Sequence, residues 1–112
     1  MTATELAAAC GFTIACGDGD REVTGGIYCC DLLSIVMGRA PADCAWVTVM
    51  GNLNSIAVAV LADCACIVLA EGMALDDDAK ARGEQQGVTV LTTTLPVYEA
   101  SVAAAKALGA LE

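Results

Sequence analysis

The chain has 112 residues, the usual size of one domain, and 57% of its residues are apolar while 17% are charged. This composition predicts a single folded domain over residues 1–112 and excludes an intrinsically disordered chain. The net charge of −9, with only five lysines and arginines, excludes the basic clusters with which proteins bind nucleic acids or anionic membranes.

The sequence also lacks the residues that most often perform catalysis. It contains no histidine, which is the most common general base and metal ligand. The phosphate-binding motifs G-x-x-x-x-G-K-[ST] and G-x-G-x-x-G are absent, and so is the G-x-S-x-G motif of hydrolases. We therefore predict a protein that is not an enzyme and that has no metal site and no cofactor. The alternative is an enzyme that uses Asp31 and Ser34, or a cysteine.

Export and membrane signals are missing as well. The first residues lack the positive charge of a signal peptide and include Glu5. The most apolar stretch, residues 56–70, is shorter than the roughly 20 residues that span a bilayer, and Asp63 interrupts it. These features predict a cytoplasmic protein.

Seven cysteines are present, and no two have the C-x-x-C spacing of redox or zinc motifs. In a reducing cytoplasm such cysteines are typically reduced, small apolar core residues. An iron–sulfur or zinc site is the alternative.

Local signals divide the chain into short helices and strands. Thr2 and Glu5 have the spacing of a capping box, which predicts a helix that ends near Cys10 before Gly11. A strand over 12–16 follows. After a glycine-containing turn, a second strand is predicted over 27–30, then a helix over 32–39 with Asp31 as its cap.

The second half of the chain continues the same alternation. Asn52 or Asn54 is expected to cap the helix at 55–62. Asp76 to Asp78 suit the first turn of the next helix, because carboxylates there interact favourably with the helix dipole. A divalent-ion cluster is the alternative interpretation of these aspartates. The remaining predicted strands are 45–50, 66–70 and 88–91, and the helices are 55–62, 76–87 and 96–108. Strands that alternate with helices form mainly parallel sheets covered on both faces. We therefore predict an α/β fold, a three-layer α/β/α domain with a five-stranded, mainly parallel or mixed sheet.

The segment from Asp20 to Gly26 is the most informative part of the sequence. It places Arg21 and Thr24 beside Gly25 and Gly26, and the two glycines permit close backbone approach. One interpretation is an anion site built from backbone N–H groups. The other is a structural bend in which Arg21 pairs with a neighbouring carboxylate.

This segment resembles the signature of the DRTGG domain family, whose named residues match Asp20, Arg21, Thr24, Gly25 and Gly26. The resemblance extends over residues 3–109 and also rests on the segments 31–37, 45–48, 54–59, 70–72 and 87–91. Asn52 departs from the pattern, because many relatives have a histidine there.

The resemblance implies a fold like the N-terminal domain of HPr kinase/phosphorylase. DRTGG domains accompany CBS domains in regulated pyrophosphatases and occur in long phosphotransacetylases. In these larger proteins the domain resembles a regulatory rather than catalytic unit that dimerises, with nucleotide binding as its proposed role. The resemblance implies the same role for this chain. The family also includes small copies in anaerobes that are sometimes encoded near hydrogenase-type electron-transfer subunits, and this resemblance suggests a protein partner of that kind.

Ligands of open α/β sheets bind beyond the carboxyl ends of the strands, where this sequence has glycines, asparagines, Glu71 and the threonines 92–94. The candidate ligand-binding residues are Arg21, Thr24, Gly25, Gly26, Asn52, Asn54, Glu71 and Gly72. The predicted function is a ligand-sensing homodimer, with a nucleotide as the candidate ligand. The alternative is a protein-interaction subunit of an anaerobic, hydrogenase-type redox assembly.

Overall fold

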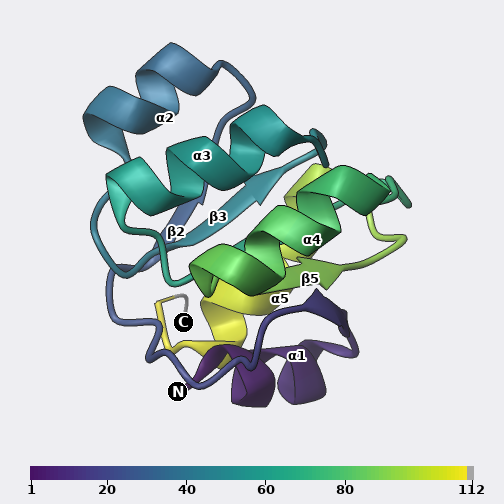
Figure 1. Ribbon diagram of the computed structural model, residues 1–112. Coiled ribbons are helices and arrows are strands. Elements are labelled where there is room, and N and C mark those ends of the chain that lie inside the picture. Colours follow the sequence, from purple (N-terminus) through teal and green to yellow (C-terminus); the bar gives the residue numbers. More distant parts are fainter. Residues whose placement is uncertain (111–112) are drawn as a thin grey trace.

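A computed structural model describes residues 1–110 as a five-stranded sheet with the strand order β1-β5-β4-β3-β2 (Figure 1). The strands are β1 (Thr13–Cys16), β2 (Ile27–Cys29), β3 (Ala45–Thr48), β4 (Cys66–Leu69) and β5 (Val90–Thr92). The helices are α1 (Ala3–Cys10), α2 (Leu33–Arg39), α3 (Leu53–Ala62), α4 (Asp77–Gln86) and α5 (Val97–Ala107). Strands β2 to β5 run parallel, and only β1 pairs antiparallel, with β5. The predicted fold class is confirmed.

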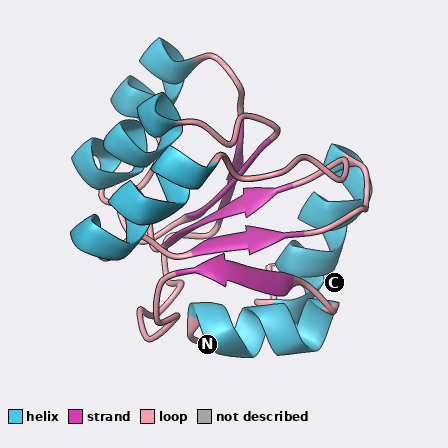
Figure 2. Ribbon diagram, turned by 45° about the vertical axis from the view of Figure 1, so that its right-hand side comes forward, coloured by secondary structure: helices cyan, strands magenta, loops and turns pink. Residues whose placement is uncertain are grey.

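Helices cover both faces of this sheet (Figure 2). Helices α1 and α5 pack on one face, where Leu6 and Leu91 are fully buried, and α2, α3 and α4 pack on the other face, where Trp46 and Ile56 are fully buried. Every residue of β3 and β4 is buried, as expected of central strands covered on both sides. Alternate residues of one strand therefore belong to two different cores.

The local helix signals are largely confirmed. Thr2 and Glu5 form the predicted capping box, and Gly11 ends α1 with a φ of 72°. Asn52 caps α3 by accepting a hydrogen bond from the Ser55 N–H at 3.1 Å, so that this helix begins earlier than predicted. Helix α4 begins at Asp77, one residue after its predicted start, with Asp76 in the cap position and Asp77 and Asp78 in the first turn.

The prediction that Asp31 caps α2 is wrong. Leu32 holds the cap position of α2, and no side chain of residues 1–110 caps that helix. The Asp31 carboxylate instead accepts hydrogen bonds from the Thr48 hydroxyl at 2.7 Å and from the Val49 N–H at 3.2 Å. Thr48 is fully buried, so its hydroxyl requires a hydrogen-bond partner. The Asp31 carboxylate is that partner, and it therefore does not cap α2.

No helix among residues 1–110 is both long enough and apolar enough to span a membrane.

All seven cysteines are free thiols. Four of them, Cys16, Cys44, Cys64 and Cys66, are buried. Cys29 is exposed.

Candidate ligand-binding site

The eight candidate residues fall into two groups at opposite ends of the parallel strands. The segment that contains Arg21 and Gly25 lies against the residues that precede β3 and β4. Asn52, Glu71 and their neighbours follow β3 and β4 and therefore lie beyond the carboxyl ends of these strands. We call these two regions the amino edge and the carboxyl edge of the sheet.

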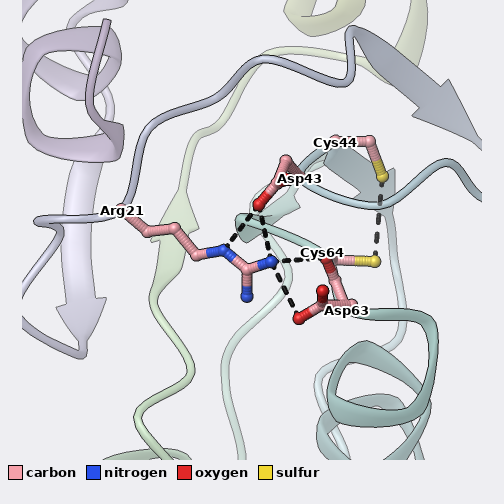
Figure 3. A network of polar contacts seen from close by, with 5 residues as sticks. All are labelled: Arg21, Asp43, Cys44, Asp63 and Cys64. Carbon is pink, nitrogen blue, oxygen red and sulfur yellow. Dashed lines mark hydrogen bonds and ion pairs between the residues drawn. The ribbon is translucent and has the colours of Figure 1, made fainter.

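At the amino edge, Arg21 joins the two loops that lead into the central strands (Figure 3). Its Nε and Nη2 atoms donate to Asp43 Oδ1 at 3.0 and 2.7 Å. Nη2 also donates to the Asp63 backbone carbonyl at 2.8 Å and lies 2.8 Å from Asp63 Oδ1. Because Asp43 precedes β3 and Asp63 precedes β4, one guanidinium fixes the entry points of both strands.

The surroundings of Arg21 favour its charged form. Partial burial lowers the pKa of Arg21, but the hydrogen bonds to Asp43 and Asp63 outweigh that effect and raise its pKa overall. The two aspartates have left-handed backbone conformations, with φ of 62° for Asp43 and 61° for Asp63, which residues other than glycine seldom adopt. The contacts of Arg21 with Asp43 and Asp63 thus stabilise two residues whose backbone conformations are unfavourable. We call Arg21, Asp43 and Asp63 the arginine clamp.

The glycines of the same segment serve close backbone packing. The N–H groups of Thr24 and Gly25 donate to the Asp43 carbonyl at 3.2 and 2.9 Å. A Cβ atom on Gly25 would lie 2.1 Å from the Ala42 carbonyl oxygen, so no side chain fits there. Gly26 has a φ of 78°. The guanidinium and these two N–H groups therefore already have acceptors within the protein.

At the carboxyl edge there is a cleft with a volume of about 410 Å³. Polar and small residues line most of it; the lining residues are Gly11, Thr13, Gly72, Met73, Ala74, Thr92, Thr93 and Thr94. Among residues 1–110, no charged side chain lines it. We call it the threonine cleft.

Glu71 and Gly72 shape one wall of this cleft. Both have left-handed backbone conformations, with φ of 63° and 70°. The Glu71 carboxylate accepts a hydrogen bond from the Val97 N–H at 2.8 Å, and the Gly72 N–H donates to the Thr93 carbonyl at 3.0 Å. The carboxylate therefore caps α5, and the backbone of Gly72 remains at the surface of the cleft.

Asn52 and Asn54 do not line the threonine cleft. Asn52 is committed to capping α3, and Asn54 is exposed within that helix. Of the eight candidates, the structure brings only Gly72 into the cleft wall, with Glu71 next to it.

Sequence reasoning did not identify Gly11 and Thr13 as cleft residues. They reach the carboxyl edge because β1 pairs antiparallel with β5, with Thr13 opposite Thr92. A strand that runs against its neighbours begins where they end, so its first residue lies at their carboxyl edge. No local signal in the sequence announces this direction.

Comparisons with known proteins give a structural neighbour only. No family model matches the chain, and no curated protein matches it in sequence. The fold is similar to a crystal structure of the CBS and DRTGG domains of the regulatory region of Clostridium perfringens pyrophosphatase, complexed with the activator diadenosine tetraphosphate. The TM-score is 0.77 at 8% sequence identity, and the alignment covers 95% of this chain but only 46% of that one. The similarity thus concerns the fold and spans about half of that regulatory region.

Proposed function

We propose that the chain is a non-catalytic regulatory domain of the DRTGG type that senses a nucleotide-class ligand in the threonine cleft. The observation that carries the proposal is an open, polar cleft at the carboxyl edge of a sheet, the position at which α/β folds bind ligands. The similarity of the fold to a nucleotide-activated regulatory region supports it.

The chemistry of the cleft favours the nucleoside part of such a ligand over its phosphates. Threonine hydroxyls and glycine backbone groups can hydrogen-bond a base or a sugar. The lining residues of the described chain include no cationic side chain and the net charge is −9, so the protein offers phosphates little electrostatic support. A volume of about 410 Å³ lies in the range of small-molecule sites and suits one nucleoside unit. We therefore expect modest affinity that changes little with salt.

Titration calorimetry with adenosine, AMP, ATP and diadenosine tetraphosphate tests this proposal. Replacing the hydroxyls in the double variant Thr92→Val/Thr94→Val removes two hydrogen-bonding groups from the lining and should weaken binding by about tenfold. The control is Asn54→Ala, because Asn54 is exposed on α3 outside the cleft. Absence of binding heat at millimolar concentrations of all four compounds contradicts the proposal, and so does hydrolysis of any of them by the purified protein.

We propose in addition that the chain forms a homodimer through the surface where α5 meets the edge strand β2. A shallow groove of about 340 Å³ lies there, with Ile27, Cys29, Tyr98, Ser101, Val102, Ala105 and Ala110 in its lining. Tyr98 is 75% exposed, and within residues 1–110 the strand β2 pairs only with β3, so that none of these residues pairs with its outer edge. Light scattering should show a dimer that Tyr98→Lys dissociates, while Leu61→Lys, on α3, leaves it intact. A monomer at high concentration contradicts this proposal.

A second candidate function, a subunit that docks in an anaerobic redox assembly, is favoured by the apolar surface of α3. Leu61 and Val60 are 70% and 42% exposed there, beside a groove that Arg82 and Gln86 of α4 complete. If this function is correct, a stoichiometric partner with redox centres should bind the wild type under anaerobic conditions. The Leu61→Lys variant should lose that partner and Tyr98→Lys should keep it.

A further inference from the structure

Behind the arginine clamp, two buried thiols lie in contact. Cys44 follows Asp43 and Cys64 follows Asp63, and their sulfur atoms are 3.7 Å apart (Figure 3). Cys44 is fully buried and Cys64 is 6% exposed. The two residues are 20 positions apart in the sequence and enter neighbouring strands, so that the clamp sets the separation of their backbones.

The backbone around the two thiols is firmly held. The Asp43 N–H donates to the Asp63 carbonyl at 2.8 Å, and the Ala65 N–H donates to the Cys44 carbonyl at 2.8 Å. Arg21 joins the same two loops from the solvent side. The sulfur atoms therefore stay together without a covalent bond between them.

The other five cysteines lie elsewhere in the fold, and Cys10 packs against the core on the face of the sheet that α1 and α5 cover. Cys16 donates to the Val88 carbonyl at 3.4 Å, and Cys66 belongs to the core on the opposite face of the sheet. Cys29 contacts the Ser101 hydroxyl at 3.1 Å, and the Cys30 thiol donates to the Leu32 carbonyl at 3.8 Å. Within residues 1–110, Cys44 and Cys64 are the only cysteines whose thiols contact each other.

We propose that Cys44 and Cys64 are a redox modification site, which peroxide converts into a reversible intramolecular disulfide between the entry points of β3 and β4. A disulfide requires the sulfur atoms to approach from 3.7 Å to about 2.05 Å, a movement within the reach of side-chain rotation. The arginine clamp supplies the preorganisation, because it holds both loops in place before oxidation.

The reaction balances with hydrogen peroxide as the oxidant. One sulfur, as a thiolate, displaces hydroxide from peroxide and becomes a sulfenic acid. The sulfur of the second thiol then attacks the sulfenic sulfur, the S–S bond forms, and water leaves with the proton of that thiol. The two sulfurs together lose two electrons, which reduce one peroxide to two waters. The hydrogen bond between the two thiols lowers the pKa of Cys44, which favours ionisation within the pair.

The experiment treats the folded wild-type protein with hydrogen peroxide, blocks the remaining thiols with an alkylating reagent under denaturing conditions, and maps the peptides by mass spectrometry. We expect a mass loss of about 2 Da before alkylation, five alkylated cysteines in place of seven, and a peptide cross-link between Cys44 and Cys64. Dithiothreitol should restore all seven thiols. Because this measurement uses the wild type, it does not depend on any variant folding.

Two variants separate this site from the more accessible thiols. In Cys10→Ser/Cys29→Ser/Cys30→Ser, the cross-link should form as in the wild type, whereas in Cys64→Ala it should be lost. The proposal is overturned if peroxide instead produces disulfides between chains through Cys29. It is also overturned if Cys44 and Cys64 remain reduced while other cysteines are oxidised, or if they proceed to sulfinic acids without a cross-link.

Discussion

The two edges of the sheet are built from similar residues but use them in opposite ways. At the amino edge, the Arg21 guanidinium donates to Asp43 and Asp63, and the Gly25 N–H donates to the Asp43 carbonyl. At the carboxyl edge, threonines and glycines surround an open cleft of about 410 Å³. A segment whose donors are already bonded to the protein has little left to offer a ligand, whereas polar residues that line an open cleft remain accessible to one. The amino edge is therefore built for stability, and the proposed function places ligand binding at the carboxyl edge.

The largest expected effect comes from closing the space at Gly25. In Gly25→Ala the new Cβ would lie 2.1 Å from the Ala42 carbonyl oxygen, so the backbone has to move and the free energy of unfolding should fall by about 3 kcal/mol. The matched control is Gly38→Ala. Gly38 lies within α2 with open space around it, and alanine there should stabilise the fold by about 0.5–1 kcal/mol. Urea denaturation measures both, and equal effects would show that the amino edge is not tightly packed.

The buried thiol of Cys66 predicts a loss of stability in alkali. Burial raises the pKa of Cys66 from 9.0 to about 12. Between these two pH values the unfolded chain releases the proton and the folded protein keeps it, so the free energy of unfolding falls as the pH rises. The slope from this one group is at most about 1.4 kcal/mol per pH unit.

Urea denaturation between pH 8 and pH 11 measures this slope. The variant Cys66→Ala should be less stable than the wild type at pH 8, because it leaves a cavity, but its stability should fall less steeply with pH. Parallel curves for the two proteins would contradict the prediction.

Breaking the arginine clamp should have a smaller effect. Arg21→Met retains an unbranched aliphatic chain but removes the hydrogen bonds to Asp43 and Asp63. We expect the free energy of unfolding to fall by about 1–2 kcal/mol. The loss is limited because the side chains of Arg21, Asp43 and Asp63 are 39%, 42% and 66% exposed, so that water partly replaces the lost partners. The control is Arg82→Met, since Arg82 is exposed on α4 and has no ion pair within residues 1–110. A clamp variant as stable as this control would mean that the ion pairs contribute nothing.

Local chemistry explains which parts of the fold were predictable. The capping box of Thr2 and Glu5, the glycine that ends α1 and the apolar strand β4 each depend on neighbours in the sequence, and each was predicted. The role of Asp31 depended on the buried hydroxyl of Thr48, 17 residues away, and was predicted wrongly.

The candidate site was harder to predict because distant segments build it. The anion-site interpretation and the structural interpretation of Arg21 could not be separated from sequence, because the partners Asp43 and Asp63 lie 22 and 42 residues further along the chain. The cleft depended on the direction of β1, which places Thr13 beside Thr92. Strand ends were a good guide to Gly72 and the threonines 92–94, but not to the antiparallel neighbour.

The smallest expected effect sharpens the comparison most, because it uses one residue type at the two ends of β5. Thr89 precedes this strand, is 3% exposed, and accepts a hydrogen bond from the Gly19 N–H at 3.1 Å. Thr94 follows the strand, is exposed, and lines the cleft. Thr89→Val leaves the Gly19 N–H without its acceptor and should cost about 1–2 kcal/mol, whereas Thr94→Val should change the free energy of unfolding by less than about 0.5 kcal/mol.

Urea denaturation and ligand titration of these two variants then separate the roles of the two edges. If the amino edge stabilises the fold and the carboxyl edge binds the ligand, Thr94→Val lowers ligand affinity and leaves stability unchanged. Thr89→Val then lowers stability and leaves ligand affinity unchanged, provided that affinity is measured where both proteins are fully folded. Because both substitutions exchange a hydroxyl for a methyl group, differences in side-chain size do not confuse the result. A stability loss at Thr94 equal to that at Thr89 would mean that the threonines of the cleft hold the fold together, and the assignment of binding to the carboxyl edge would then lose its physical basis.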